Sequence, residues 1–222
     1  MNRLYNALQL KRLHQLKQLG YRYVPLIEKR SANSSALPDD LEALKRMVEE
    51  CRLCALSKTR TKTVFGEGNP NAALMFVGEG PGAQEDTTGR PFVGRAGELL
   101  TKMIENAIEI PRSSVYIANI VKCRPPNNRV PTPEEAYTCL PYLMKQIELV
   151  SPKVVVALGA TAYHYLTGDK SGITKVRGEV IETGSYQLVP TYHPSYLLRN
   201  PSAKKEVYQD LLKIKRLLCE NC

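Results

Sequence analysis

Four short apolar runs, separated by stretches of helical periodicity, constrain the fold more than any other feature of this sequence. The runs cover residues 72–77, 114–121, 153–158 and 186–191. Helical patterns cover residues 96–108, 133–150, 160–166 and 204–218. Strands that alternate with helices join by right-handed crossovers into a mostly parallel sheet that is covered on both faces. The sequence therefore predicts an α/β fold of three layers, α/β/α, with a central four-stranded, mostly parallel sheet.

Two smaller elements extend this prediction. A further helix is expected to run from Leu41 towards Cys51, with Asp39 or Asp40 as its N-cap. The glycine-rich segment 171–184 has the composition for a small antiparallel hairpin at the edge of the sheet.

The first 37 residues differ from the rest of the chain in charge. They hold seven basic and one acidic side chain, whereas the remaining 185 residues hold 24 basic and 21 acidic ones. Residues 31–38 are small and polar, which is typical of a linker. We therefore expect a basic N-terminal extension over residues 1–37 and a folded domain over residues 38–222. An excess of positive charge favours a nucleic-acid partner, although it also serves solubility.

Hydropathy excludes a membrane protein of the helical type. No apolar run approaches the roughly 18–20 residues that a transmembrane helix needs. The N-terminal residues carry dispersed charges and lack the apolar stretch of a secretion signal. The sequence predicts a soluble, cytoplasmic protein with no membrane partner.

The six cysteines follow a regular spacing. They form the sets Cys51-x2-Cys54, Cys123-x15-Cys139 and Cys219-x2-Cys222. In a reducing compartment such sets are typical of metal ligands or redox groups rather than of disulfides. Four thiolates suit a zinc ion or an iron–sulfur cluster. The spacing alone does not distinguish zinc from an iron–sulfur cluster, and it does not show which four of the six cysteines bind the metal.

Chemically versatile residues follow the predicted strands. Ligands of open α/β sheets bind at the carboxyl ends of the strands, where this chain places the turn 78–82, Asn119, Gly159 and His193. Each has a structural alternative: a turn glycine, a capping amide or a loop histidine satisfied by backbone. The turn matches neither the dinucleotide fingerprint nor the Walker A loop.

Five segments taken together are more specific. They are Phe-Gly-Glu-Gly-Asn at 65–69, Val-Gly-Glu-Gly-Pro-Gly at 77–82, Gly-Arg-Pro-Phe-Val-Gly-Arg-Ala-Gly at 89–97, the stretch from Asn119 to Arg129, and His-Pro-Ser-Tyr-Leu-Leu-Arg at 193–199. In this order they resemble the family 4 uracil-DNA glycosylases, the iron–sulfur members of the uracil-DNA glycosylase superfamily. The resemblance covers about residues 41–218.

The resemblance implies a monofunctional DNA repair hydrolase that flips uracil out of DNA and hydrolyses its N-glycosidic bond, leaving an abasic site. Its partner is uracil-containing DNA, and a monomer is expected; no repair or replication partner is identified. Two alternatives stay open. The same fold could act on another damaged or mismatched base, or the chain could be a noncatalytic iron–sulfur protein that binds nucleic acid.

The same resemblance assigns a cofactor. It implies a [4Fe–4S] cluster, with the ligands Cys51, Cys54, Cys123 and Cys139. Cys219 and Cys222 lie outside the family pattern and are left unassigned; a zinc site shared with another chain and reduced thiols without a function are both open.

The resemblance also implies roles at the carboxyl edge of the sheet. Phe92 is expected to stack on uracil, and Asn119 to bond its O4 and N3–H. His193 is expected to donate to O2, and the Gly80 N–H to contact the base. Glu79 is expected to position water or to balance positive charge on the sugar.

Specificity and DNA affinity involve further residues. Glu85 is expected near uracil C5, where a side chain excludes the methyl group of thymine. The residues expected to bind DNA are Lys122, Arg124, Arg177 and Arg199, with Leu197 or Leu198 as the wedge that fills the space left by the flipped base.

Overall fold

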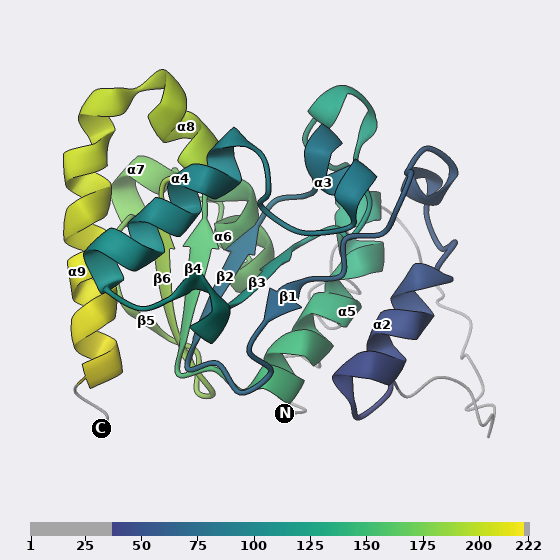
Figure 1. The fold of residues 1–222 in the computed structure, drawn as a ribbon, viewed down its shortest axis with the longest axis horizontal. Helices are drawn as coiled ribbons and strands as arrows, with labels where there is room; N and C mark the ends of the chain where they lie inside the picture. The colour runs from purple at the N-terminus through teal and green to yellow at the C-terminus, as the bar shows by residue number, and fades with distance from the viewer. Residues whose placement is uncertain (1–36, 220–222) are drawn as a thin grey trace, which may run out of the picture. The chain divides into compact units, whose positions relative to one another are not determined.

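The structure, a computed structural model, describes residues 37–219 (Figure 1). The predicted N-terminal extension, apart from Leu37, and Cys222 lie outside the described residues. The strands are β1 Glu67–Gly68, β2 Leu74–Gly78, β3 Tyr116–Asn119, β4 Val154–Leu158, β5 Ile181–Glu182 and β6 Gln187–Thr191. The longer helices are α2 Leu41–Glu49, α4 Arg95–Met103, α5 Pro133–Val150, α6 Ala160–Thr167 and α9 Lys204–Cys219. The shorter ones are α3 Ala83–Thr88, α7 Ile173–Val176 and α8 Pro194–Arg199.

One sheet of six strands forms the centre, in the order β1-β3-β2-β4-β6-β5. The four predicted strands are its inner members and run parallel to one another, which confirms the α/β class. The strand count differs from the prediction, because β1 and β5 add antiparallel pairs of two residues at the two edges. β5 lies in the segment that suggested a hairpin, and α7 occupies an earlier part of it.

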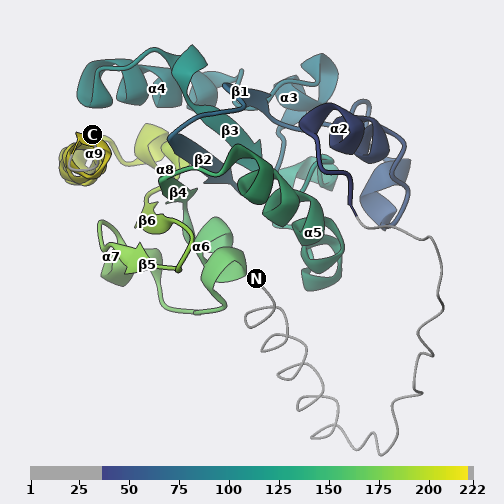
Figure 2. The ribbon, with the colours of Figure 1, turned by 90° about the horizontal axis from the view of Figure 1, so that it is seen from below.

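Helices cover both faces of the sheet (Figure 2). α4 and α9 lie on one face, whereas α5 and α6 lie on the other, with α2 packed outside α5. The strands alternate their side chains between the two resulting cores. In β2, for example, Met75 and Val77 pack towards α2 and α5, while Leu74 and Phe76 pack towards α4 and α9.

Side-chain caps set where α5 and α2 begin. α5 covers the predicted residues 133–150, because Thr132 and Glu135 form a reciprocal capping box at its start. The Asp40 carboxylate accepts a hydrogen bond from the Ala43 N–H and starts α2.

The helix predicted over residues 96–108 is α-helical only to Met103 and continues as a wider π-helical turn to Ile108. Within residues 37–219, no helix is both long and apolar enough to cross a membrane.

Candidate functional site

The carboxyl ends of the parallel strands bring together residues that are far apart in the sequence. Gly78 ends β2 and pairs in register with Asn119, the last residue of β3. His193 stands two residues after β6 and is the N-cap of α8. The edge of the sheet therefore carries an amide and an imidazole next to the turn that begins at Gly78.

The space that a side chain at position 78 would need is occupied by the side chains of Asn119 and Phe92. A Cβ atom there would lie 2.4 Å from Asn119 Oδ1 and 2.6 Å from Phe92 Cζ. The Phe92 ring in turn lies 5.7 Å from the His193 ring, inclined by 35°. Asn119, Phe92 and His193 thus converge beside Gly78 and can contact one small planar ligand.

The side chain of Asn119 is buried, with 1% of the residue exposed. Among the described residues, its Oδ1 is one of two buried side-chain polar atoms that have no hydrogen-bond partner. Leaving such an acceptor unpaired costs about 1–3 kcal/mol. The arrangement is therefore suited to a ligand that brings its own N–H donor.

The hydrogen bonds of His193 fix which ring nitrogen can donate. Its Nδ1 accepts from the Ser195 N–H at 3.1 Å and lies 2.8 Å from Ser195 Oγ. Burial, aided by the charge of Arg199 and opposed by that of Glu85, lowers the pKa of His193 to about 4. The ring is thus neutral at pH 7, and with Nδ1 accepting, its proton lies on Nε2.

Glu79 is oriented by a residue that the sequence analysis did not select. The Thr161 hydroxyl donates a short hydrogen bond to Glu79 Oε2. Thr161 lies in the first turn of α6, directly after the carboxyl end of β4, so the topology rule that pointed to Gly159 also pointed here. Gly159 itself lies against His193, because a Cβ atom at this position would be 3.2 Å from the Cβ atom of the histidine.

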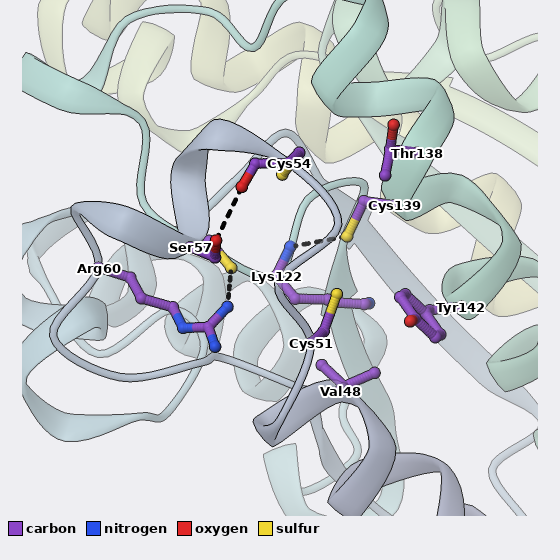
Figure 3. Close-up of a pocket in the computed structure, with 10 residues that line it drawn as sticks. Val48, Cys51, Cys54, Ser57, Arg60, Lys122, Thr138, Cys139 and Tyr142 are labelled. Carbon is purple, nitrogen blue, oxygen red and sulfur yellow. Dashed lines mark hydrogen bonds between the residues drawn. The ribbon is translucent and has the colours of Figure 1, made fainter.

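The second candidate site is a hollow lined by four thiols (Figure 3). Cys51 follows α2, Cys54 precedes a 3₁₀ turn, Cys123 lies in the loop after β3 and Cys139 lies in α5. Arg60 lies on one side, and its Nη1 donates to Cys123 Sγ at 3.1 Å.

The four thiols surround this hollow without meeting at one point. Among residues 37–219, no group of three or more His, Cys, Asp or Glu side chains is arranged to hold a single metal ion. The Lys122 N–H donates to Cys139 Sγ at 3.3 Å. Burial raises the pKa of the Cys139 thiol to about 12 and raises that of Cys123. The donor set is purely thiol and suits a group larger than one ion.

Comparison with known proteins identifies the family. The family model described as the uracil DNA glycosylase superfamily matches residues 65–212. A type-4 uracil-DNA glycosylase of Thermotoga maritima is 51% identical, over 80% of this chain and 94% of that protein. A type-4 uracil-DNA glycosylase of Sulfurisphaera tokodaii is 46% identical, over 81% of this chain and 85% of that protein. This chain belongs to the type-4 family of uracil-DNA glycosylases.

In this type-4 family member, two of the residues expected to bind DNA make contacts with other parts of the protein. Lys122 is 1% exposed, and its Nζ donates to the Asn119 carbonyl and to Gln146 Oε1. Desolvation lowers the pKa of Lys122 to about 8. Arg177 pairs with the buried Asp210 at 2.7 Å. The prediction that Lys122 binds DNA is wrong, because its side chain is buried and bound within the protein, whereas the same role for Arg177, whose side chain is 18% exposed, stays a prediction.

The two leucines proposed as a wedge both lie in α8, and they differ in solvent exposure. Leu197 is 1% exposed and packs in the core on the α4 and α9 side, whereas Leu198 is 38% exposed. The prediction for Leu197 is therefore wrong, and Leu198 keeps the wedge role as a proposal. Arg199 is exposed and Arg124 is half-buried, so both remain candidates for DNA contact.

Glu85 makes backbone contacts that the sequence analysis missed. Its Oε1 accepts hydrogen bonds from the Val93 and Gly94 N–H groups, each at 2.9 Å. Its Oε2 accepts from the Gly82 N–H at 3.2 Å. The carboxylate thus joins the turn after β2 to the loop that carries Phe92. Its expected role near uracil C5 stays a prediction.

Proposed function

We propose that this chain is a DNA repair glycosylase that hydrolyses the bond between uracil and deoxyribose and leaves an abasic site. Three curated relatives are type-4 uracil-DNA glycosylases that match this chain along most of their length. One structural observation supports the proposal above all others. The buried Asn119 Oδ1 has no partner among the described residues and lies beside an aromatic ring, where a flipped base can bring an N–H.

Base recognition follows from the hydrogen-bonding pattern of uracil. Asn119 can accept from N3–H with Oδ1 and donate to O4 with Nδ2, while Phe92 stacks on the ring. Cytosine presents the reverse pattern, an unprotonated N3 and an amino group. Binding cytosine would leave buried polar groups unpaired, and such a mismatch gives strong discrimination.

Bond cleavage needs charge stabilisation at two places. The C1′–N1 bond breaks with its electron pair moving to uracil, and water supplies hydroxide to C1′ and a proton that ends on the base or in solvent. The neutral His193 donates from Nε2 to O2, where negative charge develops. The Gly80 N–H is proposed to contact the base as well. Glu79, held by Thr161, balances positive charge on the sugar or positions the water.

DNA contact is proposed for residues around α8 and the loop after β3. Flipping a nucleotide costs a few kcal/mol, and a side chain that fills the vacated space offsets part of this cost. Leu198 is exposed on α8 and next to Arg199, which can pair with a phosphate. Arg124 is the corresponding candidate on the other loop. The monomeric state and cytoplasmic location stay predictions.

We propose that Cys51, Cys54, Cys123 and Cys139 hold a [4Fe–4S] cluster. The donor set fits, because such clusters are ligated by four cysteine thiolates. Arg60 donates to one of these sulfurs, and the buried Lys122 interacts electrostatically with Cys139 and Cys123, so positive charge offsets the thiolates. When bound, the cluster supplies a structural link between the end of α2, the loop after β3 and α5.

The proposed function is tested by incubating the purified full chain with oligonucleotides that contain one uracil. We expect alkali-labile breaks at uracil, and His193→Ala should reduce the single-turnover rate by roughly 10²–10³-fold while DNA binding persists. Breaks at hypoxanthine or mismatched thymine but not at uracil would favour the same fold acting on another base. DNA binding without any base release would favour the noncatalytic alternative.

The pH dependence of excision should reflect a neutral histidine. Because the pKa of His193 is lowered to about 4, the ring stays neutral as pH falls through its ordinary value near 6.5. Single-turnover rates measured from pH 8 to pH 5 should show no fall centred near pH 6.5. Over the same interval folding stability should decrease, because the unfolded chain takes up the proton first. A rate that halves as the pH falls through 6.5 would show that His193 keeps its ordinary pKa in the folded chain, and a rate that rises as the pH falls would show that the imidazolium is the active form.

A single methyl group at Gly78 should close the base pocket. In Gly78→Ala the new Cβ would come within 2.4 Å of Asn119 Oδ1 and 2.6 Å of Phe92, so one of them must move. We expect uracil excision to fall by about 100-fold or more, the loss seen when one catalytic hydrogen-bond donor is removed. Gly172→Ala is the matched control, since no atom lies within 4 Å of its added Cβ. Equal activity of the two variants would contradict the proposed pocket.

A further inference from the structure

The backbone of Phe92 adopts a conformation that its side chain disfavours. Its φ of +52° lies in the left-handed region, which residues other than glycine rarely occupy. Such a conformation persists only where the surroundings hold it, and it is often found at functional sites. Something in the fold must therefore fix the turn that presents the Phe92 ring.

Arg112 forms hydrogen bonds with this turn from one side. Its Nη2 donates to the Pro91 carbonyl at 2.8 Å, and its Nη1 donates to the Phe92 carbonyl at 3.1 Å. The same guanidinium is oriented by two further acceptors, Glu67 Oε1 at 2.9 Å and Thr101 Oγ1 at 3.0 Å. The planar fork of an arginine can satisfy four acceptors in fixed directions, which a lysine cannot.

The other side of the turn is held by the opposite charge. Arg112 donates hydrogen bonds to the carbonyls of residues 91 and 92. The Glu85 carboxylate accepts hydrogen bonds from the next two backbone N–H groups, those of Val93 and Gly94. Gly97 closes the space behind, since a Cβ atom there would lie 1.9 Å from the Phe92 carbonyl oxygen. Four consecutive residues, 91–94, are thus clamped between a cation and an anion.

We propose that Arg112 is a positioning residue, which sets the affinity for uracil by holding Phe92 in its stacking conformation. The inference rests on the proposed function. Without the guanidinium the turn can relax from its left-handed conformation, and the ring is no longer fixed 5.7 Å from that of His193. Arg112 is proposed to contact neither base nor sugar, so that its effect passes entirely through Phe92.

The test compares Arg112→Met with Arg90→Met in the full chain. Arg90 bonds the same carboxylate, Glu67, but its side chain is 65% exposed, against 18% for Arg112. The probe is free uracil as a competitive inhibitor of excision. We expect Arg112→Met to raise the inhibition constant for uracil about tenfold, because part of the stacking free energy between base and ring is lost. Arg90→Met should leave this constant within twofold of the parent value. Affinity for uracil-free DNA should not change in either variant.

A double-mutant cycle with Phe92→Ala separates positioning from general damage. If Arg112 acts through Phe92, Arg112→Met should have no further effect on the inhibition constant in the Phe92→Ala background. An unchanged constant in Arg112→Met, or a full effect that persists without Phe92, would overturn the proposal. If Arg112→Met does not fold, Arg112→Lys is carried through the same cycle. A parent protein that releases no uracil would instead refute the proposed function.

Discussion

Asn119→Asp should reduce uracil excision by roughly 10³-fold or more, while leaving the shape of the pocket unchanged. Replacing the amide by a carboxylate removes the donor to O4 and puts a negative charge beside that carbonyl in a buried site. A site built to hydrogen-bond its substrate rejects an analogue that lacks the matching group by about 10⁴–10⁵-fold. Single-turnover excision from a uracil-containing duplex measures the effect.

The same substitution should change which base is accepted. A carboxylate accepts from the amino group of cytosine, so we expect slow release of cytosine that the parent does not show. Asn71→Asp makes the same chemical change at an exposed position and is the matched control. If Asn119→Asp retained uracil excision within tenfold of the parent, the side chain that reads the base would have to be another one.

The sequence was sufficient for the centre of the fold and insufficient for its edges. The four inner strands were predictable because each is a nearly continuous apolar run, as fully buried parallel strands are. The start of α5 was predictable because Thr132 and Glu135 carry a capping signal. β1 and β5 have two residues each, and α3 and α8 have six, too few to show periodicity.

For the candidate site, the sequence could place residues along the chain but not orient them. The burial of Lys122 depends on Gln146, which lies 24 residues further on in α5. Arg177 is held by Asp210, which is 33 residues away in α9. Such pairings between distant elements leave no local pattern. Arg112 was missed for the same reason, since its acceptors near Phe92 lie about 20 residues earlier.

The second large effect is expected from the cysteine hollow. Cys139→Ser should abolish the broad visible absorbance of the purified protein and lower its Tm by about 10 °C or more. The reason is that a bound metal group contributes its binding free energy to folding. Cys139 belongs to α5, while its proposed co-ligands follow α2 and β3, so losing one ligand releases three segments at once. Absorption spectra, iron and sulfide content and calorimetry of the same preparations measure both effects.

Cys219→Ser is the matched control for this prediction, since it removes one thiol from a different place. Cys219 is exposed at the end of α9, which covers the opposite face of the sheet from α5 (Figure 2). Its replacement should leave colour, iron content and Tm unchanged. A colourless parent with one zinc per chain would contradict the proposed cluster. A brown Cys139→Ser variant with full iron content would show that Cys139 is not a ligand, so that another residue must complete the site.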